Sequence, residues 1–301
     1  MWPLKQKYRF RAPRETAPAE IIFRFLKKCV YSINMITISE LYYYPVKSCK
    51  GIALKEAEIG RRGILDDREF MLVNESGLFI SQRNYPRMAL IQSDWRGERL
   101  ILSAPGMDPI EHTPFTGGEA ITVKVWHDRC RAIDQGDEIA AWLADYLGQT
   151  VRLVRFPEDE IRKVDPAFCK FDEDQTSFTD GFPFLLISES SLRDLNQRMA
   201  VALPVDRFRP NIVVSGSVPY AEDTWAGFTA GNVEFSVVKP CARCVITTVN
   251  QENGIAGDEP LNTLSKYRRS SDGKVLFGQN LIHHRNGMIR VGDRLTITGH
   301  N

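Results

Sequence analysis

The patterned part of this sequence opens with Ile36-Thr37-Ile38-Ser39-Glu40-Leu41-Tyr42-Tyr43-Tyr44, a run of β-branched, apolar and aromatic residues. Such residues favour extended backbone, and Pro45 directly after the run indicates that a strand ends there. Further short runs of the same kind follow, with glycines between or beside them: Ile52 to Ile59, Glu69 to Val73, Leu78 to Gln82, Arg99 to Ser103 and Ile121 to Trp126. Short strands at such spacing are typical of a β-barrel or a β-sandwich.

Helices enter further along the chain. Apolar residues recur at helical spacing from Asp137 to Leu147, and Gly148 follows as a stop signal. The charged stretch from Pro157 to Thr179 is predicted to be a long connection. Beyond it we expect strands at Phe182 to Ile187, Asn211 to Ser215, Asn232 to Val238 and Val245 to Val249, helices at Ser188 to Met199 and Pro260 to Tyr267, and a closing hairpin at Met288 to Thr298. The prediction is a mainly β protein with some α-helix, of the α+β class.

Charge and cysteine usage exclude several classes of protein. The 301 residues carry 39 Lys and Arg against 38 Asp and Glu, which argues against a nucleic-acid or membrane-surface protein. No apolar run reaches the roughly 18 residues that a membrane-spanning helix needs. Among the six cysteines only Cys241 and Cys244 are close in sequence. A disulfide framework is therefore not indicated, and a reducing compartment such as the cytoplasm is expected.

Residues 1–34 differ from the rest of the chain. They are basic, and the apolar stretch from Ile21 to Ile33 is interrupted by Arg24, Lys27 and Lys28. No small-residue cleavage site follows, so a secretory signal is not indicated. We interpret this segment as a mis-set start or a disordered tail. The alternative is an organellar presequence, in which case the protein is mitochondrial.

The motif that bears most directly on chemistry is Lys239-Pro240-Cys241-Ala242-Arg243-Cys244. A zinc site needs further cysteine or histidine ligands at suitable spacing, and the sequence offers none. A thioredoxin-like redox motif needs a helix after the first cysteine, whereas Val245 to Val249 is predicted to be a strand. On spacing alone, two buried structural cysteines are favoured. Arg243 and Lys239 shift the balance, because neighbouring cations stabilise the thiolate that coordinates soft metals.

Two other segments have residues suited to anions. Pro45-Val46-Lys47-Ser48-Cys49-Lys50-Gly51 can present backbone N–H groups and ammonium charge, and Arg207-Phe208-Arg209-Pro210-Asn211 can offer a guanidinium to a phosphate and an amide to a heterocycle. Taken singly, the first segment is better explained as a solvated loop and the second as an ordinary surface ion pair.

Together these segments resemble the MOSC-domain family. Tyr44 to Gly51, Asp67-Arg68, Phe208 to Asn211, Tyr220 to Trp225, Cys241 to Cys244, Phe277 to Asn280 and Val291 to Asp293 occur in the order found in that family, whose members include YcbX-like proteins and the mitochondrial amidoxime-reducing component. The likeness extends from Met35 to the end of the chain. It implies a MOSC N-terminal β-barrel-like region over residues 35–150 and a MOSC β-barrel domain over residues 151–301.

The resemblance also implies a site. Cys244 would be the molybdenum ligand and the catalytic centre, with Cys241 as a neighbour that does not bind the metal. The residues implied to hold a molybdenum–molybdopterin cofactor are Lys47, Ser48, Arg68, Asp180, Arg209, Asn211, Ala242, Arg243 and Asn280. Gly181, Phe182 and Asn280 depart from the pattern of the mitochondrial relatives, so details of the substrate pocket are not carried over.

The implied reaction is reduction of N-hydroxylated compounds such as amidoximes, hydroxylamines and N-hydroxylated bases. The chain has neither a four-cysteine iron–sulfur set nor a Gly-rich dinucleotide fingerprint. We therefore expect electrons from a separate donor, either a flavoprotein reductase or a small iron–sulfur protein. We also expect a monomer. The alternative is a module that carries the cofactor or binds it during sulfuration, without turnover of its own.

Overall fold

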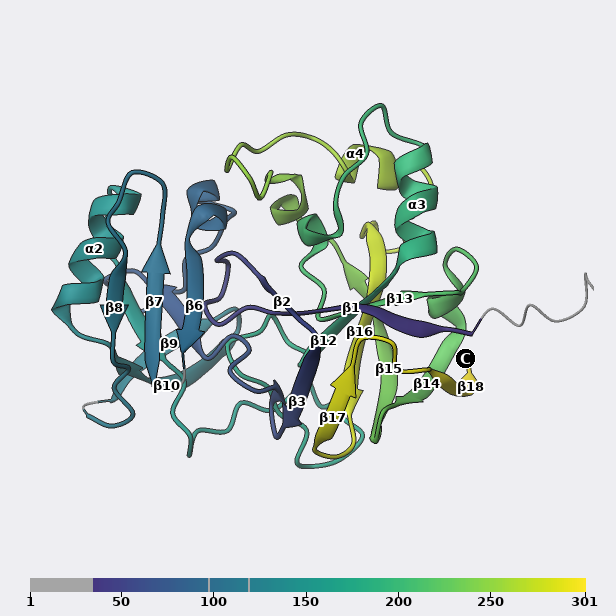
Figure 1. The fold of residues 1–301 in the computed structure, drawn as a ribbon, viewed down its shortest axis with the longest axis horizontal. Helices are drawn as coiled ribbons and strands as arrows, with labels where there is room; N and C mark the ends of the chain where they lie inside the picture. The colour runs from purple at the N-terminus through teal and green to yellow at the C-terminus, as the bar shows by residue number, and fades with distance from the viewer. Residues whose placement is uncertain (1–34, 97, 119) are drawn as a thin grey trace, which may run out of the picture. The chain divides into compact units, whose positions relative to one another are not determined.

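An eight-stranded sheet organises the C-terminal half of the protein (Figure 1). The computed structural model describes residues 35–96, 98–118 and 120–301, and Ile36–Asn301 form one compact unit. The strand order is β18 (Thr296–His300), β14 (Trp225–Ala230), β15 (Val233–Ala242), β16 (Leu276–His283), β12 (Phe184–Ser188), β13 (Ile212–Ser215), β1 (Thr37–Tyr43) and β2 (Ile52–Leu54). Within this sheet β12 and β13 pair in parallel and the other pairs are antiparallel.

Three smaller sheets complete the strand structure. Their strand orders are β5 (Phe70–Val73), β11 (Arg152–Arg155), β10 (Asp128–Asp134) and β9 (Ala120–Val125); β17 (Gly287–Arg290), β3 (Glu56–Gly60) and β4 (Gly63–Ile64); and β6 (Gln92–Arg96), β7 (Arg99–Ser103) and β8 (Ile110–His112). The sheets curl as half-barrels, which confirms the mainly β prediction with some helix.

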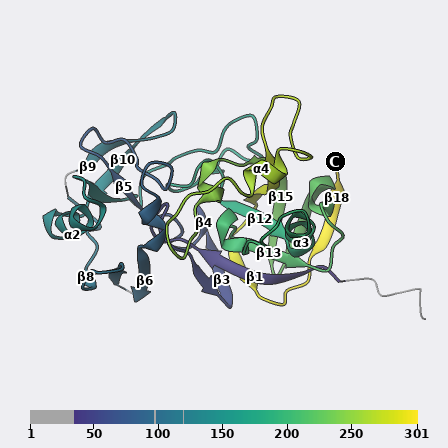
Figure 2. The same cartoon turned by 90° about the horizontal axis from the view of Figure 1, so that it is seen from above.

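The helices are short, and their ends follow local signals. Helix α2 (Asp137–Leu147) has the predicted bounds, with two acidic residues in its first turn. Gly148 ends it in a left-handed conformation, with φ of 68°, and donates its N–H to Ala144 at 2.8 Å. Helices α3 (Glu189–Gln197) and α4 (Leu261–Leu264) are shorter than expected. Helix α2 packs against β8 and β11 (Figures 1 and 2).

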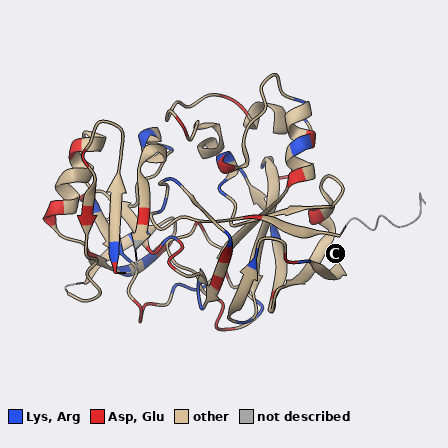
Figure 3. Ribbon diagram, viewed as in Figure 1, with Lys and Arg blue, Asp and Glu red and all other residues tan. Residues whose placement is uncertain are grey.

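Four 3-10 helices, η1 (Pro86–Leu90), η2 (Val205–Phe208), η3 (Ala221–Thr224) and η4 (Val245–Thr248), complete the elements of the described chain. No helix in the described part of the chain is long and apolar enough to cross a membrane. Basic and acidic residues are interspersed in the view of Figure 3, in keeping with the balanced charge of the sequence.

Four local predictions were wrong. The single strand expected at Ile52 to Ile59 is divided into β2 and β3, which belong to different sheets. The strand expected at Val245 to Val249 is replaced by η4 (Val245–Thr248), because the hydroxyls of Thr247 and Thr248 donate to the carbonyls three residues earlier, at 2.9 and 2.8 Å. The expected hairpin at Met288 to Thr298 is absent from the described chain, since β17 pairs with β3 and β18 with β14. The run from Leu78 to Gln82 makes only isolated bridges.

Hydrogen bonding crosses the division that we predicted near residue 150. Strand β1 pairs with β13, with Leu41 opposite Ile212, and β5 pairs with β11, with Leu72 opposite Leu153. The assignment of two domains at residues 35–150 and 151–301 therefore stays a prediction. Residues 1–34, interpreted as a mis-set start, tail or presequence, lie outside the described residues.

Strand pairing brings distant segments to one edge of the large sheet. Because β12 and β13 run in parallel, the segments that precede them begin at the same end, and these contain Asp180 and Arg209. The antiparallel β1 ends beside the start of β13, which places Lys47 there as well. Lys239 of β15 lies opposite Asn280 of β16, which lies opposite Leu185 of β12. The residues implied by the resemblance are thus gathered by the topology.

Candidate functional site

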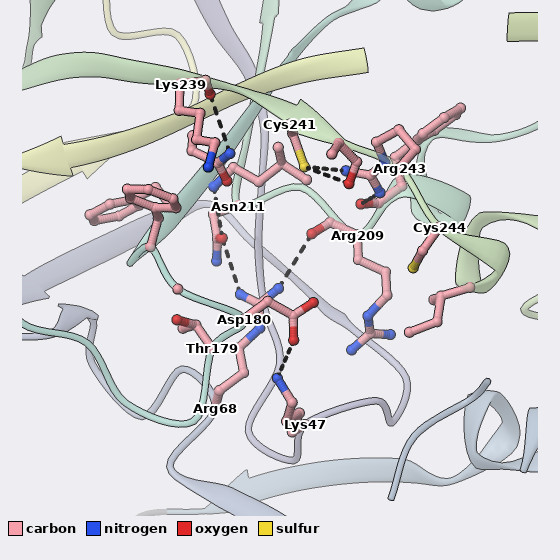
Figure 4. Close-up of a pocket in the computed structure, with 18 of the residues that line it drawn as sticks. Lys47, Arg68, Thr179, Asp180, Arg209, Asn211, Lys239, Cys241, Arg243 and Cys244 are labelled. Carbon is pink, nitrogen blue, oxygen red and sulfur yellow. Dashed lines mark hydrogen bonds and ion pairs between the residues drawn. The ribbon is translucent and has the colours of Figure 1, made fainter. Parts of the chain in front are cut away.

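All ten residues predicted for the site line one cavity of about 270 Å³. They come from the turn after β1, the turn before β5, the segments before β12 and β13, the end of β15, and β16. Figure 4 shows Lys47, Arg68, Asp180, Arg209, Arg243 and Cys244 around this cavity. Their convergence from six parts of the chain is a finding of the structure; their roles toward a cofactor remain proposals.

Several residues of the site have strained backbones. Ser48, Arg68 and Arg209 have φ of 66°, 52° and 56°, in the left-handed region that residues with a Cβ seldom adopt. Such conformations persist only where the surroundings impose them, and they cluster at binding and catalytic sites. The strain fixes where these three side chains leave the backbone.

The Tyr44 ring contacts two of the cationic groups. The guanidinium carbons of Arg68 and Arg209 lie 4.1 and 4.3 Å from the centre of its ring. The ring is buried, and its hydroxyl donates to the Pro210 carbonyl at 3.0 Å. Cation–π contact with a fixed ring holds both arginines at the cavity wall, although like charges repel.

The side-chain amide of Asn211 is hydrogen-bonded to protein groups. Its amide nitrogen donates to the Tyr42 carbonyl at 3.2 Å and to Asp67 at 3.1 Å, and its oxygen accepts from Arg68 at 3.0 Å. Arg68 also donates to the Asp67 carboxylate. The amide that we expected to read a heterocycle is therefore engaged by protein groups, and it positions Arg68.

Lys47 and Asp180 form an ion pair in which both residues line the cavity, with Nζ 2.5 Å from Oδ1. Burial lowers the pKa of Lys47 to about 8, although the Asp180 carboxylate acts in the opposite direction. Burial alone would raise the pKa of Asp180, but the Lys47 ammonium, Arg83 and Trp126 hold it below its ordinary value. Asp180 is therefore charged, while Lys47 is poised to lose its proton just above neutral pH.

The two cysteines each have an arginine partner. Arg243 donates through Nη1 to the Cys241 sulfur at 3.0 Å and through Nη2 to the Phe208 carbonyl at 2.7 Å. Arg83 donates through Nη2 to the Cys244 sulfur at 3.3 Å. Cys241 lies in β15 and Cys244 directly precedes η4, so no helix begins at the first cysteine as a thioredoxin-like motif requires. That exclusion stands although the strand predicted after Cys244 was wrong.

Sequence reasoning missed Arg83, which contacts Cys244, and Trp126, which contacts Asp180. Arg83 follows the run from Leu78 to Gln82, and Trp126 ends another predicted strand. Trp126 donates its indole N–H to Asp180 at 3.1 Å, and the guanidinium carbon of Arg83 lies 4.5 Å from the Trp126 ring centre. The only sequence signal was an arginine directly after a predicted strand, which is too common to single out.

The chemistry of the cavity fits an anionic cofactor with a soft metal. Five cationic side chains line it (Lys47, Arg68, Arg209, Lys239 and Arg243) against the single carboxylate of Asp180. The buried Nε of Arg243 has no hydrogen-bond partner within the described protein, and such an atom is costly unless a ligand satisfies it. The Cys244 sulfur can supply one thiolate ligand. These groups would hold a phosphate-bearing cofactor whose metal accepts a single cysteine.

Comparison with known proteins agrees with this geometry. Residues 35–150 match the family described as MOSC N-terminal beta barrel domain, and residues 173–296 match the family described as MOSC domain. The human mitochondrial amidoxime-reducing component 1 is 38% identical over 283 residues, which cover 87% of this chain and 83% of that protein. This chain belongs to the MOSC-domain family.

Other relatives give this MOSC-domain protein its context. The bovine (Bos taurus) mitochondrial amidoxime reducing component 2 is 36% identical, over 85% of this chain and 82% of the relative. A zebrafish (Danio rerio) molybdenum cofactor sulfurase is 34% identical over 82% of this chain, but the match spans only 32% of the sulfurase. Among solved structures, the YUAD protein from Bacillus subtilis covers 87% of this MOSC-domain chain and 94% of its own at a TM-score of 0.39 and 10% identity, which is too remote to support an argument.

Proposed function

We propose that this MOSC-domain protein binds a molybdenum–molybdopterin cofactor through Cys244 and reduces N-hydroxylated compounds. The observation that carries the proposal is the single cavity in which the Cys244 sulfur and five cationic side chains meet from distant parts of the chain. The names of the amidoxime-reducing relatives support the type of reaction.

Each residue of the cavity would have a defined task. Arg209 and Arg243 offer guanidinium groups to the cofactor phosphate, with Lys47 as an additional cation. The backbone and hydroxyl of Ser48, with Ala242 and Asn280, would contact the pterin, while Asn211 keeps Arg68 in place. Asp180 holds the Lys47 ammonium at the cavity. When bound, the cofactor supplies the two-electron chemistry.

The overall reaction is balanced by an external donor. An amidoxime takes up two electrons and two protons, the N–O bond breaks, and an amidine and one water are released. The electrons come from a separate flavoprotein reductase or small iron–sulfur protein. The cavity residues bind and orient; the donor provides the reducing equivalents.

Metal analysis tests the proposal. The protein is expressed in a host that makes the cofactor, and molybdenum and pterin per mole of protein are measured for wild type and Cys244→Ala. We expect near-stoichiometric metal in the wild type and its loss in Cys244→Ala. Cys169→Ala is the matched control, because Cys169 is a free thiol outside the cavity. A wild-type protein free of molybdenum would sink the proposal.

The similarity to a molybdenum cofactor sulfurase favours a second candidate function. In that case the protein carries the cofactor, or holds it during sulfuration, and turns over no substrate. Benzamidoxime reduction with a reduced viologen dye separates the two functions. A loaded protein that reduces benzamidoxime is an enzyme, whereas one that releases its cofactor readily and shows no reduction with any donor is a carrier.

The location in the cell is part of the same proposal. We propose a cytoplasmic protein, or a mitochondrial one if residues 1–34 act as a presequence, as the names of the animal relatives would suggest. Fluorescent fusions with and without residues 1–34 decide between these outcomes.

A further inference from the structure

Arg83 makes a contact to Cys244 that the proposed function does not explain. Its Nη2 lies 3.3 Å from the Cys244 sulfur, within the range of an N–H···S hydrogen bond. The same nitrogen lies 3.9 Å from the Asp180 carboxylate. Arg83 is thus the arginine that reaches the proposed metal ligand, whereas Arg243 donates to Cys241.

The guanidinium is held from several sides. Its carbon lies 4.5 Å above the Trp126 ring, and Nη1 lies 3.3 Å from the Ser81 hydroxyl. Trp126 is itself fixed, because its indole N–H donates to Asp180 and its ring contacts Phe79 at 5.3 Å between centres. Trp126 has a left-handed backbone, with φ of 57°, at the turn between β9 and β10. A cation stacked on a fixed ring is oriented before any ligand arrives.

The segment that carries Arg83 is also hydrogen-bonded to the loop that follows Cys244. Gln82 donates its amide to the Ser48 carbonyl at 2.8 Å and exchanges hydrogen bonds with Gln251, seven residues after Cys244. Both glutamines are buried. These buried hydrogen bonds therefore fix the segment of Arg83 relative to the loop that follows Cys244.

A hydrogen bond to a metal-bound sulfur has a definite electronic effect. It draws electron density from the thiolate, and hydrogen bonds to ligand sulfurs are among the features that set the reduction potential of a metal centre. A fixed positive charge nearby also favours the addition of an electron. Both effects act in the same direction.

We propose that Arg83 is a positioning and tuning residue that donates to the Cys244 sulfur and raises the reduction potential of the bound molybdenum. The inference rests on the proposed function, because it requires that Cys244 ligates the metal. It assigns a role to the N-terminal region in the electronic properties of the centre, in addition to its share in forming the cavity.

The experiment compares loaded wild type, Arg83→Gln, Arg83→Lys and Arg87→Gln. Molybdenum content is measured first, then the midpoint potential by a redox titration followed by electron paramagnetic resonance, then kcat and KM for benzamidoxime. Arg87→Gln is the matched control, since the Arg87 guanidinium also lies over an aromatic ring, 4.5 Å from the centre of Tyr146, whereas the hydrogen bond to the Cys244 sulfur comes from Arg83. Thermal unfolding reports whether each variant is folded.

We expect Arg83→Gln to keep its metal, to shift the potential to more negative values, and to lower kcat about 10- to 100-fold with little change in KM. Arg83→Lys, which retains the charge, should show a smaller shift, and Arg87→Gln none. If Arg83→Gln does not fold, Trp126→Leu removes the ring that holds the guanidinium and should shift the potential in the same direction.

The outcomes separate the two proposals. Wild-type protein without molybdenum overturns the proposed function, and the inference with it. Loaded Arg83→Gln with the wild-type potential and kcat overturns the inference alone. Folded Arg83→Gln that has lost its metal also overturns it, because Arg83 would then hold the cofactor and not tune it.

Discussion

The side-chain amides of Gln82 and Gln251 donate to each other: Nε2 of Gln82 lies 3.1 Å from Oε1 of Gln251, and Nε2 of Gln251 lies 3.0 Å from Oε1 of Gln82. Gln251 also donates to the Val249 carbonyl, and Gln82 to the Ser48 carbonyl. This reciprocal pair connects the loop after Cys244 to the turn that carries Lys47 and Ser48. It joins two walls of the cavity through a buried contact.

Removing one amide should therefore loosen both walls. Gln82→Ala leaves the side-chain oxygen of Gln251 and the Ser48 carbonyl without their donor in a buried site, so we expect it to lower the free energy of unfolding by about 1–3 kcal/mol. Urea denaturation measures the loss. The double variant with Gln251→Ala should lose less than the sum of the two single variants, because it leaves fewer orphaned groups. Strict additivity would show that the pair does not act as a unit.

Gly51 should be required for the packing of Arg68 and Arg209 against the Tyr44 ring. A Cβ at Gly51 would lie 2.4 Å from Cε1 of the Tyr44 ring, which is buried and contacted by the guanidiniums of Arg68 and Arg209. We expect Gly51→Ala to lower the free energy of unfolding by about 1–3 kcal/mol, since the ring cannot move without displacing both guanidiniums. It should also weaken sulfate binding, measured by calorimetry on the cofactor-free protein. Gly257→Ala is the control, because a Cβ there meets nothing within 4 Å; equal effects of both changes would contradict the prediction.

Anion binding should weaken as pH rises through about 8. Lys47 faces Asp180, Arg162 and Arg68, and burial lowers its pKa to about 8, so above that pH the cavity loses one cation. Sulfate affinity of the cofactor-free protein, measured by calorimetry from pH 7 to 9.5, should fall in wild type. Lys47→Met should bind more weakly at pH 7 and show no such fall. Parallel pH curves for the two proteins would exclude Lys47 as the titrating group.

The rise in pH that weakens anion binding through Lys47 should increase the stability of the protein. A lysine whose folded pKa is lowered from 10.5 to about 8 binds fewer protons in the folded than in the unfolded state between these values. Its contribution to the free energy of unfolding therefore rises with pH across that window. Thermal unfolding of wild type and Lys47→Met across this range should show a wild-type gain that the variant lacks.

Arg162 should fix the end of the long connection before Asp180. Its side chain is buried, with Nη1 donating to the carbonyls of Ser177 and Thr179 at 2.7 and 2.8 Å. We expect Arg162→Ala to cost about 1–3 kcal/mol, since these carbonyls lose their partner, and to speed hydrogen exchange over residues 157–179. Arg131→Ala is the control, because Arg131 binds Asp159 and Glu160 of the same connection from an exposed position. Faster exchange in Arg131→Ala than in Arg162→Ala would reverse this assignment.

The prediction was correct where all the signals for an element lie within or directly beside that element. Helix α2 was predicted with its correct bounds because its periodicity, acidic first turn and Gly148 are all local. Val245 to Val249 was misread because β-branched residues favour strands, whereas the hydroxyls of Thr247 and Thr248 bond to nearby carbonyls. The hairpin prediction failed because the N–H groups of Gly292 and Leu295 donate to the carbonyls of Ile38, in β1, and of Ile36, just before β1, which separates the strands on either side.

The site was predicted as a set of residues but not as a set of contacts. Order and spacing, read through the family resemblance, gave ten residues that line one cavity. The use of the Asn211 amide within the protein could not be predicted, since it depends on the approach of Tyr42 and Asp67 from another segment. Arg83 was missed for the same reason: its position follows from how Gln82 meets Gln251, which no local pattern records.

The crossed pairing of β1 with β13 and of β5 with β11 has a consequence for how the chain can be divided. Cleavage near residue 150 would strip β11 from β5 and leave β13 with an unpaired edge where β1 had been. Exposed edges of this kind promote aggregation. Two fragments produced separately should therefore be insoluble, whereas co-expressed fragments should reassemble by strand complementation and recover the cavity. Each region would then depend on the other for its strand partners as well as for its share of the cavity.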